Sequence, residues 1–161
     1  MDITVRPARD ADTDAVVRLS LRAWEPAFRS FRRLLGDALY TRLIPDWESS
    51  QSEAVAALVK GDGKSIVWVA EVAGVVAGFV AYVLDGESKT GEVTYLAVDP
   101  AFQRRGVGTE LNRLALAQMK QAGMTMARVE TAGDASHAAA RKAYEKAGYT
   151  GLPLVRYFQA L

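Results

Sequence analysis

The stretch of sequence that decides the fold is VDPAFQRRGVGTE, which runs from Val98 to Glu110. It ends an apolar run, turns at Asp-Pro, and passes through two glycines into a helical pattern. Such a turn suits a phosphate group, because the first N–H groups of the helix are free and the positive end of its dipole lies behind them. Gly106 and Gly108 let the backbone approach a ligand closely, and Arg104 and Arg105 add positive charge. The same pattern is compatible with a plain strand-to-helix turn whose arginines are solvated.

Two well-known phosphate-binding loops do not match this stretch. A Walker loop needs a lysine after its second glycine, and here Thr109 follows Gly108. The dinucleotide fingerprint needs a third glycine where this chain has Leu111, and the acid expected on the following strand is out of place. A nucleotide-binding protein of another kind stays open as a hypothesis.

Length and composition favour one domain, residues 1–161, with a proper hydrophobic core: half of the residues are hydrophobic and 24% are charged. A net charge of +1 is too balanced to suggest a nucleic-acid partner. The chain has no cysteine, which excludes disulfides, thiolate zinc sites and thiol nucleophiles. Its single histidine, His137, excludes a multi-histidine metal site, so we expect no metal.

The beginning of the chain, MDITVRPARDADTD, is charged and lacks the apolar region of a signal peptide. Together with the absence of cysteine, this favours a cytoplasmic protein. The most apolar stretch, residues 66–84, approaches the length of a membrane span. Glu71 and the Ala73-Gly74 pair interrupt it, so two strands of a hairpin explain it better and no membrane partner is expected.

Hydrophobic periodicity predicts alternating helices and strands along the chain. Strands are expected at Ile3–Pro7, at Ile66–Val72, and over residues 75–84, 92–98 and 125–131, with terminal strands in residues 149–161. Helices are expected over residues 10–24, 28–43 (with a break at Gly36-Asp37), 51–60 (capped by Ser49, Ser50 or Ser52), 108–122 and 136–147.

The segment 92–131 reads as strand, loop, helix and strand, which is a crossover between two parallel strands. Short turns join the strands before it, so those strands should be antiparallel. The predicted fold class is α/β (α+β): one mixed, mostly antiparallel, twisted sheet with a parallel βαβ unit and helices on both faces.

Two motifs resemble one protein family. Gln103-Arg104-Arg105-Gly106-Val107-Gly108 is similar to the Q/R-x-x-G-x-G/A signature of the GNAT superfamily of N-acetyltransferases. HAAARKAYEKAGY, residues 137–149, resembles the family's N-x-x-A-x-x-L-Y-x-x-x-G-F/Y segment, and ITVRPARDAD resembles its first strand. The resemblance therefore covers nearly the whole chain. One departure is His137 in place of the family's usual Asn; histidine can still hydrogen-bond, and it can equally serve as a local helix cap.

The resemblance implies acetyl-CoA as the donor and a primary amine as the acceptor. It also implies that the strands on either side of the helix splay apart, so that the backbone of Leu96 and Val98 binds the pantetheine arm like an added strand. The N–H of Ala97 or Val98 would polarise the thioester carbonyl. The cofactor-binding set implied in this way is Leu96, Ala97, Val98, Gln103, Arg104, Arg105, Gly106, Val107, Gly108, Thr109, His137 and Tyr144.

The resemblance also implies proton donors and acceptors. Tyr144 occupies the family's general-acid position, although taken alone it is more typical of a core aromatic. Glu92 is the candidate general base, because it lies close to where some members of the family carry a catalytic glutamate. Regular alternation would put it on one face with Thr94, Leu96 and Val98, and it can equally be a solvated glutamate at a strand start. Glu130, which is otherwise a surface or salt-bridge residue, is the fallback. The same two glutamates are expected near the acceptor.

The acceptor pocket is expected between the first two helical regions. Its candidate walls are Trp24, Phe28, Phe31, Tyr40 and Trp47, most of which would serve equally well as core residues. A basic cluster in the second helical region either binds an anionic group of the acceptor or forms a solvent-exposed helix face: Arg29, Arg32 and Arg33.

Several function hypotheses follow from this reading. The leading one is an N-acetyltransferase that acts on a small amine by direct attack in a ternary complex. The alternatives are a catalytically silent acyl-CoA sensor on the same fold and a protein N-terminal or lysine acetyltransferase. A homodimer through residues 149–161 is compatible with the sequence.

Overall fold

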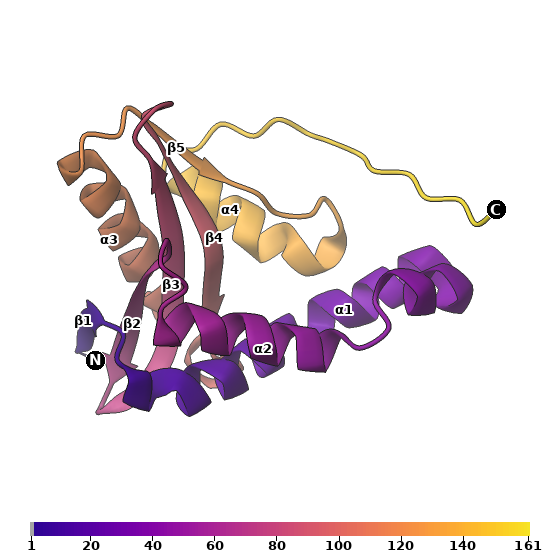
Figure 1. Cartoon of the computed structure of the whole chain (residues 1–161), viewed down its shortest axis with the longest axis horizontal. Helices are drawn as coiled ribbons and strands as arrows, with labels where there is room; N and C mark the ends of the chain where they lie inside the picture. Colours follow the sequence, from indigo (N-terminus) through magenta and orange to yellow (C-terminus); the bar gives the residue numbers. More distant parts are fainter. Residues whose placement is uncertain (1) are drawn as a thin grey trace.

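The structure is a computed structural model that describes residues 2–161. Figure 1 shows a sheet flanked by helices, with an extended terminal segment that leaves the body of the protein. The strands are β1 (Ile3–Pro7), β2 (Ile66–Val72), β3 (Val75–Asp85), β4 (Thr90–Val98) and β5 (Met126–Val129). The helices are α1 (Thr13–Leu43), α2 (Trp47–Lys60), α3 (Val107–Gln121) and α4 (Ala138–Lys146).

The sheet has the strand order β1-β2-β3-β4-β5. The pairs from β1 to β4 are antiparallel, whereas β4 and β5 are parallel and are joined by the crossover through α3. The predicted fold class, a mixed and mostly antiparallel sheet with one parallel βαβ unit, is confirmed.

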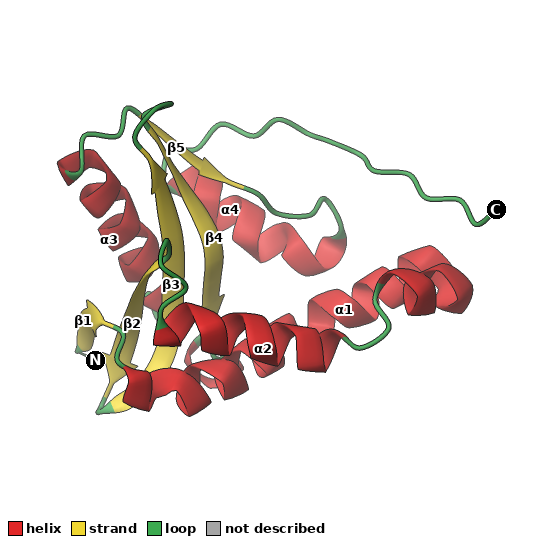
Figure 2. Cartoon of the chain, in the orientation of Figure 1, coloured by secondary structure: helices red, strands yellow, loops and turns green. Residues whose placement is uncertain are grey.

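Helices cover both faces of the sheet, as predicted (Figure 2). On one face, α3 buries Val107, Leu111 and Met119 against β3 and β4. On the other face, α1 and α2 bury Leu19 and Val55 against β2 and β3. Because every inner strand is covered on both sides, β3 is buried without interruption from Ala77 to Tyr82.

Helix α1 differs from the prediction of two helical regions on either side of Pro26. It spans Thr13–Leu43 with Pro26 inside it, and it is kinked at Gly36, where the backbone leaves helical geometry with φ of 75°. Proline removes one helical hydrogen bond, but Ala27 is buried on the helix face beside it. Packing therefore holds the turn around Pro26, while the break at Gly36 agrees with the sequence.

Helix α2 begins at Trp47, four residues before the predicted start at Gln51. The predicted serine caps are wrong, because the capping side chain is that of Asp46, which accepts a hydrogen bond of 3.1 Å from the N–H of Ser49. An aspartate before a helix serves this purpose as well as a serine does.

The terminal strands predicted in residues 149–161 are not formed. This part of the chain has no regular structure, and each of residues 150–161 is exposed. A strand needs a neighbouring strand for its backbone hydrogen bonds, and the single chain pairs none with this segment. Within residues 2–161, no helix combines the length and apolar character that crossing a bilayer requires.

Close packing between β3 and β4 makes Gly78 a sensitive position. A Cβ atom there would lie 2.8 Å from the carbonyl oxygen of Ala97 and 3.1 Å from side-chain atoms of Leu111 and Val107. We expect Gly78→Ala to lower the free energy of unfolding by about 1–3 kcal/mol, since overpacking a filled core forces backbone shifts. Urea unfolding followed by circular dichroism measures this loss.

The matched control is Gly86→Ala in the turn between β3 and β4, where a Cβ atom meets nothing within 4 Å. Its effect should stay within about 0.5 kcal/mol of zero. Equal unfolding midpoints for the two variants would contradict the tight approach of β3 to β4.

Candidate functional site

The two parallel strands separate part-way along the sheet. Backbone pairing between β4 and β5 starts at Thr90 with Met126 and ends at Val93 with Val129. Residues 94–98 of β4 continue past this point, and among residues 2–161 no strand pairs with them on the β5 side. The chain therefore presents a free strand edge in the interior of its sheet. This edge lies at the end of β4 that leads into the loop before α3.

The loop that follows β4 is held by its own polar groups. Asp99 accepts a hydrogen bond of 3.0 Å from the N–H of Ala101 and starts a short 3-10 turn, Pro100–Phe102. Gln103 donates from Nε2 to the carbonyl oxygen of Val98 at 3.2 Å. The side chain of Gln103 thus ties the loop to the end of β4 and does not extend toward the start of α3.

The start of α3 has no side-chain cap. Gly106, with φ of 89°, occupies the cap position and brings no side chain, so the first N–H groups of α3 lack a side-chain acceptor. Gly108, in the first turn, lies under β4: a Cβ atom there would be 3.4 Å from the Val98 side chain. Arg104 and Arg105 are exposed beside these N–H groups. Free N–H groups, the helix dipole and two cations together suit an anionic ligand.

An ion pair that the sequence reasoning missed fixes this loop to α1. Asp99 is buried and accepts a hydrogen bond from Arg22, and its own N–H donates to the carbonyl oxygen of Ala77 at 2.9 Å. Only the turn-forming character of Asp99-Pro100 was visible in the sequence. The partner lies 77 positions away in the chain, where no local pattern could identify it.

The position of Glu92 corrects a prediction. Val93 packs on the α3 side of the sheet, and Tyr95, only two positions later, packs on the α1 side. The reason is a bulge: Tyr82 pairs with Val93 and Ala81 with Tyr95, which leaves Thr94 between them. A bulge shifts strand alternation by one residue.

The prediction that Glu92, Thr94, Leu96 and Val98 share one face is therefore wrong. Leu96 and Val98 pack toward α3. Glu92 precedes Val93 and lies on the opposite face, toward α1.

Glu92 and Glu130 share a cation that the sequence reasoning also missed. Arg128 on β5 lies 3.6 Å from a carboxylate oxygen of each glutamate. Glu92 is the less exposed of the two, with 35% of its side chain accessible against 68% for Glu130. Parallel pairing places Arg128 directly beside Glu92, which is a register that the sequence alone did not provide.

Tyr144 lies on α4 and packs edge-to-face against Tyr149, with ring centroids 5.7 Å apart. Burial, and to a lesser degree the neighbouring Tyr149, raises the pKa of Tyr144 to about 12. The phenol therefore stays protonated near neutral pH and has a hydrogen to donate. Within residues 2–161, no hydrogen bond joins Tyr144 to Glu92 or Glu130.

His137 belongs to a polar cluster between α1 and the start of α4. Its Nδ1 lies 2.5 Å from a carboxylate oxygen of Asp134, and the other oxygen accepts a hydrogen bond of 2.6 Å from the hydroxyl of Ser30 on α1. The ring of Phe31 stacks on the imidazole at 5.5 Å. This arrangement directs the Nδ1 edge to Asp134 and leaves Nε2 as the ring nitrogen that a ligand could contact.

Asp134 is the centre of that cluster. Burial alone would raise its pKa, but hydrogen bonds from Ser136, Ser30 and His137 outweigh burial and hold the pKa of Asp134 below its usual range. Arg141 closes the same turn by donating to the carbonyl oxygens of Ala132 (2.6 Å) and Asp134 (2.8 Å). The sequence reasoning missed Asp134, although an aspartate directly before a helical turn is a common N-cap residue.

A cavity of about 200 Å³ lies between the second half of α1 and the start of α2. Phe28 and Trp47 stack at 4.3 Å, and Tyr40 lies beneath the guanidinium of Arg32 at 5.8 Å. Three of the five predicted aromatic walls, Phe28, Tyr40 and Trp47, line this cavity, together with Glu25, Arg29, Arg32 and Glu48. The cavity therefore carries aromatic surfaces and charges of both signs.

The remaining predicted residues lie elsewhere. Trp24 packs against Phe79 and Tyr95 in the core cluster on the α1 side of the sheet. Phe31 contacts His137 instead of the cavity. Arg33 is exposed, so Arg29 and Arg32 are the members of the basic cluster that reach the cavity.

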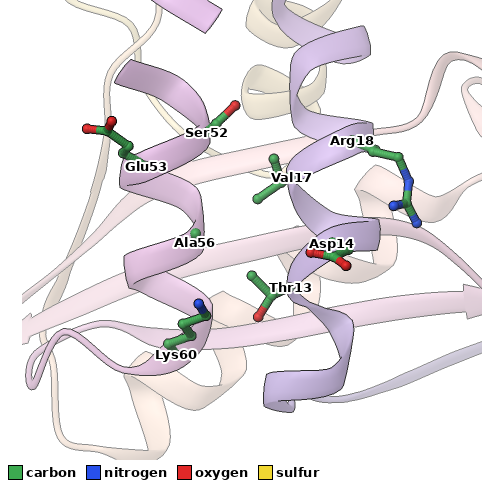
Figure 3. Close-up of a pocket in the computed structure, with 8 residues that line it drawn as sticks. All are labelled: Thr13, Asp14, Val17, Arg18, Ser52, Glu53, Ala56 and Lys60. Carbon is green, nitrogen blue, oxygen red and sulfur yellow. The ribbon is translucent and has the colours of Figure 1, made fainter. Parts of the chain in front are cut away.

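A second hollow, of about 360 Å³, separates the first half of α1 from the second half of α2. In Figure 3, Thr13, Val17 and Lys60 point into the space between the helices, whereas Glu53 and Arg18 point away from it. None of the residues predicted for the site lines this hollow. Residues 2–161 contain no group of three or more metal-ligating side chains that could hold a metal ion.

Comparison with known proteins identifies the family. A model of the acetyltransferase (GNAT) family matches residues 28–149, which include both motifs and more than half of the chain. This chain belongs to the GNAT family of acetyltransferases. A search of curated proteins gives no match.

Solved structures with the same fold include other GNAT proteins. PaiA N-acetyltransferase from Thermoplasma acidophilum, in complex with coenzyme A, has a TM-score of 0.72 and 16% identity, with 93% of this chain and 91% of that chain covered. The aminoglycoside acetyltransferase AAC(6')-Iy, bound to a CoA bisubstrate analogue, has a TM-score of 0.68 and 15% identity, with 100% and 99% covered. Escherichia coli ribosomal-protein-S18-alanine N-acetyltransferase has a TM-score of 0.66 and 19% identity, with 94% and 80% covered.

The described residues fit a coenzyme A molecule. The free edge of β4 can pair with an extended amide chain, because an edge strand offers unpaired N–H and C=O groups. The uncapped start of α3 offers N–H groups to a pyrophosphate. The two features are continuous along the chain, as a ligand with both chemical parts requires.

The cluster around Asp134 generates a pH prediction. A depressed carboxylate pKa contributes stability above the unfolded value of 3.8 and loses it as pH falls through the lower folded value. We expect wild type to lose melting temperature more steeply than Asp134→Asn as pH drops below about 4. Calorimetric scans between neutral and acid pH measure the difference.

Asp85→Asn is the matched control, since the pKa of Asp85 is also lowered, but by Ser88 and Glu87 in an exposed turn. At neutral pH, Asp134→Asn should also lose about 1–3 kcal/mol through its weakened buried hydrogen bonds, and Asp85→Asn should lose less. Parallel curves for wild type and Asp134→Asn would contradict the assignment of Asp134 as the link between α1 and α4.

Proposed function

We propose that this GNAT acetyltransferase transfers the acetyl group of acetyl-CoA to the primary amine of a small molecule. The observation that carries the proposal is the free edge of β4 beside the uncapped start of α3. The family and the neighbours crystallised with CoA or its analogues support the same donor. A cytoplasmic location stays a prediction from the sequence.

In the proposed complex, the N–H groups from Arg104 to Thr109 hold the pyrophosphate, and the backbone of Leu96 and Val98 binds the pantetheine arm. Acetyl-CoA, when bound, supplies the acetyl group as a thioester. The N–H of Ala97 or Val98 donates to the thioester carbonyl and favours the charge that develops there. Gln103 braces the loop, and Nε2 of His137 contacts the arm in place of the family's asparagine.

Two proton movements complete the proposed reaction. An alkylamine has a pKa of about 10 and must lose a proton before it attacks. Glu92 is the proposed acceptor of that proton, because it lies on the face of the sheet that α1 covers and is less exposed than Glu130. Direct attack is proposed, since the chain has no cysteine to carry the acetyl group. The C–S bond breaks after the C–N bond has formed, the nitrogen gives up its second proton to solvent, and the departing thiolate takes a proton from solvent.

Tyr144 is the proposed hydrogen donor to the leaving sulfur. Its pKa of about 12 lies above the value of about 8.5 for a thiol, so full proton transfer to the thiolate is uphill. The phenol therefore stabilises the departing sulfur by a hydrogen bond and keeps its proton.

The cavity between α1 and α2 supports a small acceptor. Its volume of about 200 Å³ suits a compact molecule, and Glu25 and Glu48 line it together with Arg29 and Arg32, of which Arg29 pairs with Glu25. Phe28 and Trp47 add aromatic faces, which attract ammonium groups. Phe28 lies one helical turn after Trp24, which contacts Tyr95 on β4, so the cavity is next to the strand that carries the proposed chemistry.

Two alternatives share the fold. Its neighbours include acetyltransferases for aminoglycosides and for a ribosomal protein, so the fold alone does not choose between a small molecule and a protein. A catalytically silent sensor would bind acetyl-CoA without turnover.

Binding of the donor is tested by thermal unfolding with acetyl-CoA, ATP and NAD at equal concentration. At a hundredfold excess over its Kd, acetyl-CoA should add about 2.7 kcal/mol of stability and raise the melting temperature by several degrees. ATP and NAD should leave the melting temperature nearly unchanged. Arg105→Glu should weaken acetyl-CoA binding about tenfold, because it reverses a charge beside the proposed pyrophosphate site.

The matched control is Arg113→Glu on α3, where the native arginine pairs with Glu110 instead of lying at the helix start. It should bind acetyl-CoA within about twofold of wild type, as expected for an exposed pair. A folded protein whose melting temperature does not change with acetyl-CoA, or that binds ATP more tightly, would contradict acetyl-CoA as the donor.

Catalysis is tested with Tyr144→Phe and Glu92→Gln in an assay of thiol release with a panel of small amines. Each variant should lose about 10²-fold or more in kcat, as is typical when an acid or base is removed, while acetyl-CoA affinity is retained. Glu130→Gln is the control and should stay within a few-fold of wild type. A protein that binds acetyl-CoA but turns over no amine would favour the sensor.

A further inference from the structure

The two carboxylate oxygens of Asp134 have different partners. One of them, Oδ2, accepts hydrogen bonds from the hydroxyl of Ser30 on α1 at 2.6 Å and from the N–H of Ser136 at 3.1 Å, and it also accepts one from the hydroxyl of Ser136. The other, Oδ1, lies 2.5 Å from Nδ1 of His137. Asp134 is therefore held through one oxygen and meets the imidazole with the other.

The hydrogen between Asp134 and His137 belongs to the imidazole. A separation of 2.5 Å between Oδ1 and Nδ1 requires a hydrogen between these atoms. Burial raises the pKa of Asp134, but hydrogen bonds from Ser136, Ser30 and His137 outweigh burial and hold this pKa below its usual range. The carboxylate is therefore ionised near neutral pH, and the hydrogen is on Nδ1. A neutral imidazole with its hydrogen on Nδ1 has a free lone pair on Nε2, so Nε2 accepts a hydrogen bond and cannot donate one.

The ring of His137 is also held on its face. The ring of Phe31 stacks on it, with the centroids 5.5 Å apart and the planes 16° apart. Only 16% of the His137 side chain is exposed, and within residues 2–161 the hydrogen bonds of its ring are all made by Nδ1. A ring fixed at one nitrogen and on one face presents Nε2 as a single acceptor in a set direction.

Helix α1 places this ring near the free edge of β4. Trp24 contacts Tyr95, which belongs to the part of β4 that does not pair with β5. Phe31 follows Trp24 by seven residues, so the two side chains share one face of α1 and lie about 10 Å apart along its axis. A chain as long as the pantetheine arm can span that distance, from the strand edge to the imidazole.

We propose that Asp134 is a positioning residue for the acetyl-CoA arm: it keeps the hydrogen of His137 on Nδ1, so that Nε2 accepts a hydrogen bond from an amide N–H of the arm. An asparagine side chain at position 137 could donate or accept, whereas His137 in this form only accepts. The inference rests on the proposed function, because acetyl-CoA must be the ligand. It deepens that function by giving the hydrogen bond a direction and by making binding depend on Asp134.

The substitution Asp134→Asn should reverse the hydrogen bond to the ring with little change in shape. Three donor groups converge on the position of Oδ2, so the amide oxygen takes that position and the NH₂ group takes the position of Oδ1. The NH₂ group then donates to Nδ1, and the ring hydrogen moves to Nε2. An Nε2–H would face the N–H of the arm, and two donors would meet without an acceptor.

Nuclear magnetic resonance measures the position of the ring hydrogen directly, because the chain has a single histidine. The full chain with isotope-labelled histidine is studied in mildly alkaline buffer, in which an imidazole is neutral. Wild type should carry the hydrogen on Nδ1, Asp134→Asn should carry it on Nε2, and acetyl-CoA should shift the Nε2 signal of wild type. Hydrogen on Nε2 in wild type, or the same tautomer in both proteins, would overturn the proposal.

Titration calorimetry with acetyl-CoA measures the effect on binding. Asp134→Asn should bind about tenfold more weakly than wild type, as expected when a buried donor loses its acceptor. In a His137→Asn background the same substitution should change the affinity by less than about twofold, because no imidazole is left to orient. Its loss of thermal stability should persist in both backgrounds. The matched control is Asp85→Asn, which removes a carboxylate that binds Ser88 in an exposed turn and should bind acetyl-CoA like wild type.

These results distinguish the positioning role from the proposed donor. If wild type and Asp134→Asn bind acetyl-CoA equally, or if Asp134→Asn weakens binding to the same extent in the His137→Asn background, Asp134 does not act through the imidazole and only acetyl-CoA as the donor stands. If wild type does not bind acetyl-CoA at all, the proposed donor is wrong and the contact with the arm is wrong with it.

Discussion

The site depends on one constraint: β4 is a core strand and a free edge at the same time. It pairs with β3 along its whole length, but with β5 only as far as Val93. The bulge at Thr94 lies where this pairing ends and shifts the strand alternation. Because of that shift, Glu92 lies on the α1 side while Leu96 and Val98 pack on the α3 side, and the β5-facing backbone edge of residues 94–98 stays unpaired.

Interactions between distant parts of the chain fix the elements around this edge. Arg22 on α1 holds the loop through Asp99, and Ser30, two turns later on the same helix, holds the start of α4 through Asp134. Helix α1 therefore positions both the loop between β4 and α3 and the motif that contains His137 and Tyr144. Since Glu25, Phe28, Arg29 and Arg32, which precede the break at Gly36, also line the aromatic cavity, the same helical segment relates the proposed donor site to the proposed acceptor site.

Much of the fold could be predicted from the sequence, because local patterns determine it. Alternation located the first four strands, and the two glycines located the start of α3 to within one residue. The parallel crossover followed from the order of the elements. The gap predicted between residues 24 and 28 is wrong, because packing next to Pro26, where Ala27 is buried, outweighs the loss of one hydrogen bond.

The site was harder to predict, because its geometry depends on pairings across the chain. Regular alternation misplaced Glu92, since a bulge leaves no local mark in the sequence. Arg128 and Asp134 were missed for the same reason: their partners are set by strand register and by helix docking. The terminal strands were expected from composition, which indicates the tendency to form a strand but not whether a neighbouring strand is available.

The backbone at Arg104 has a further consequence. Its φ of 59° lies in the left-handed region, where a residue with a side chain costs about 1–2 kcal/mol more than glycine does. Glycine would be the more stable choice for the empty loop, yet it would remove a positive charge from the start of α3. If the loop binds the pyrophosphate as proposed, replacing Arg104 by glycine would relieve the backbone strain and at the same time remove a positive charge from the proposed site.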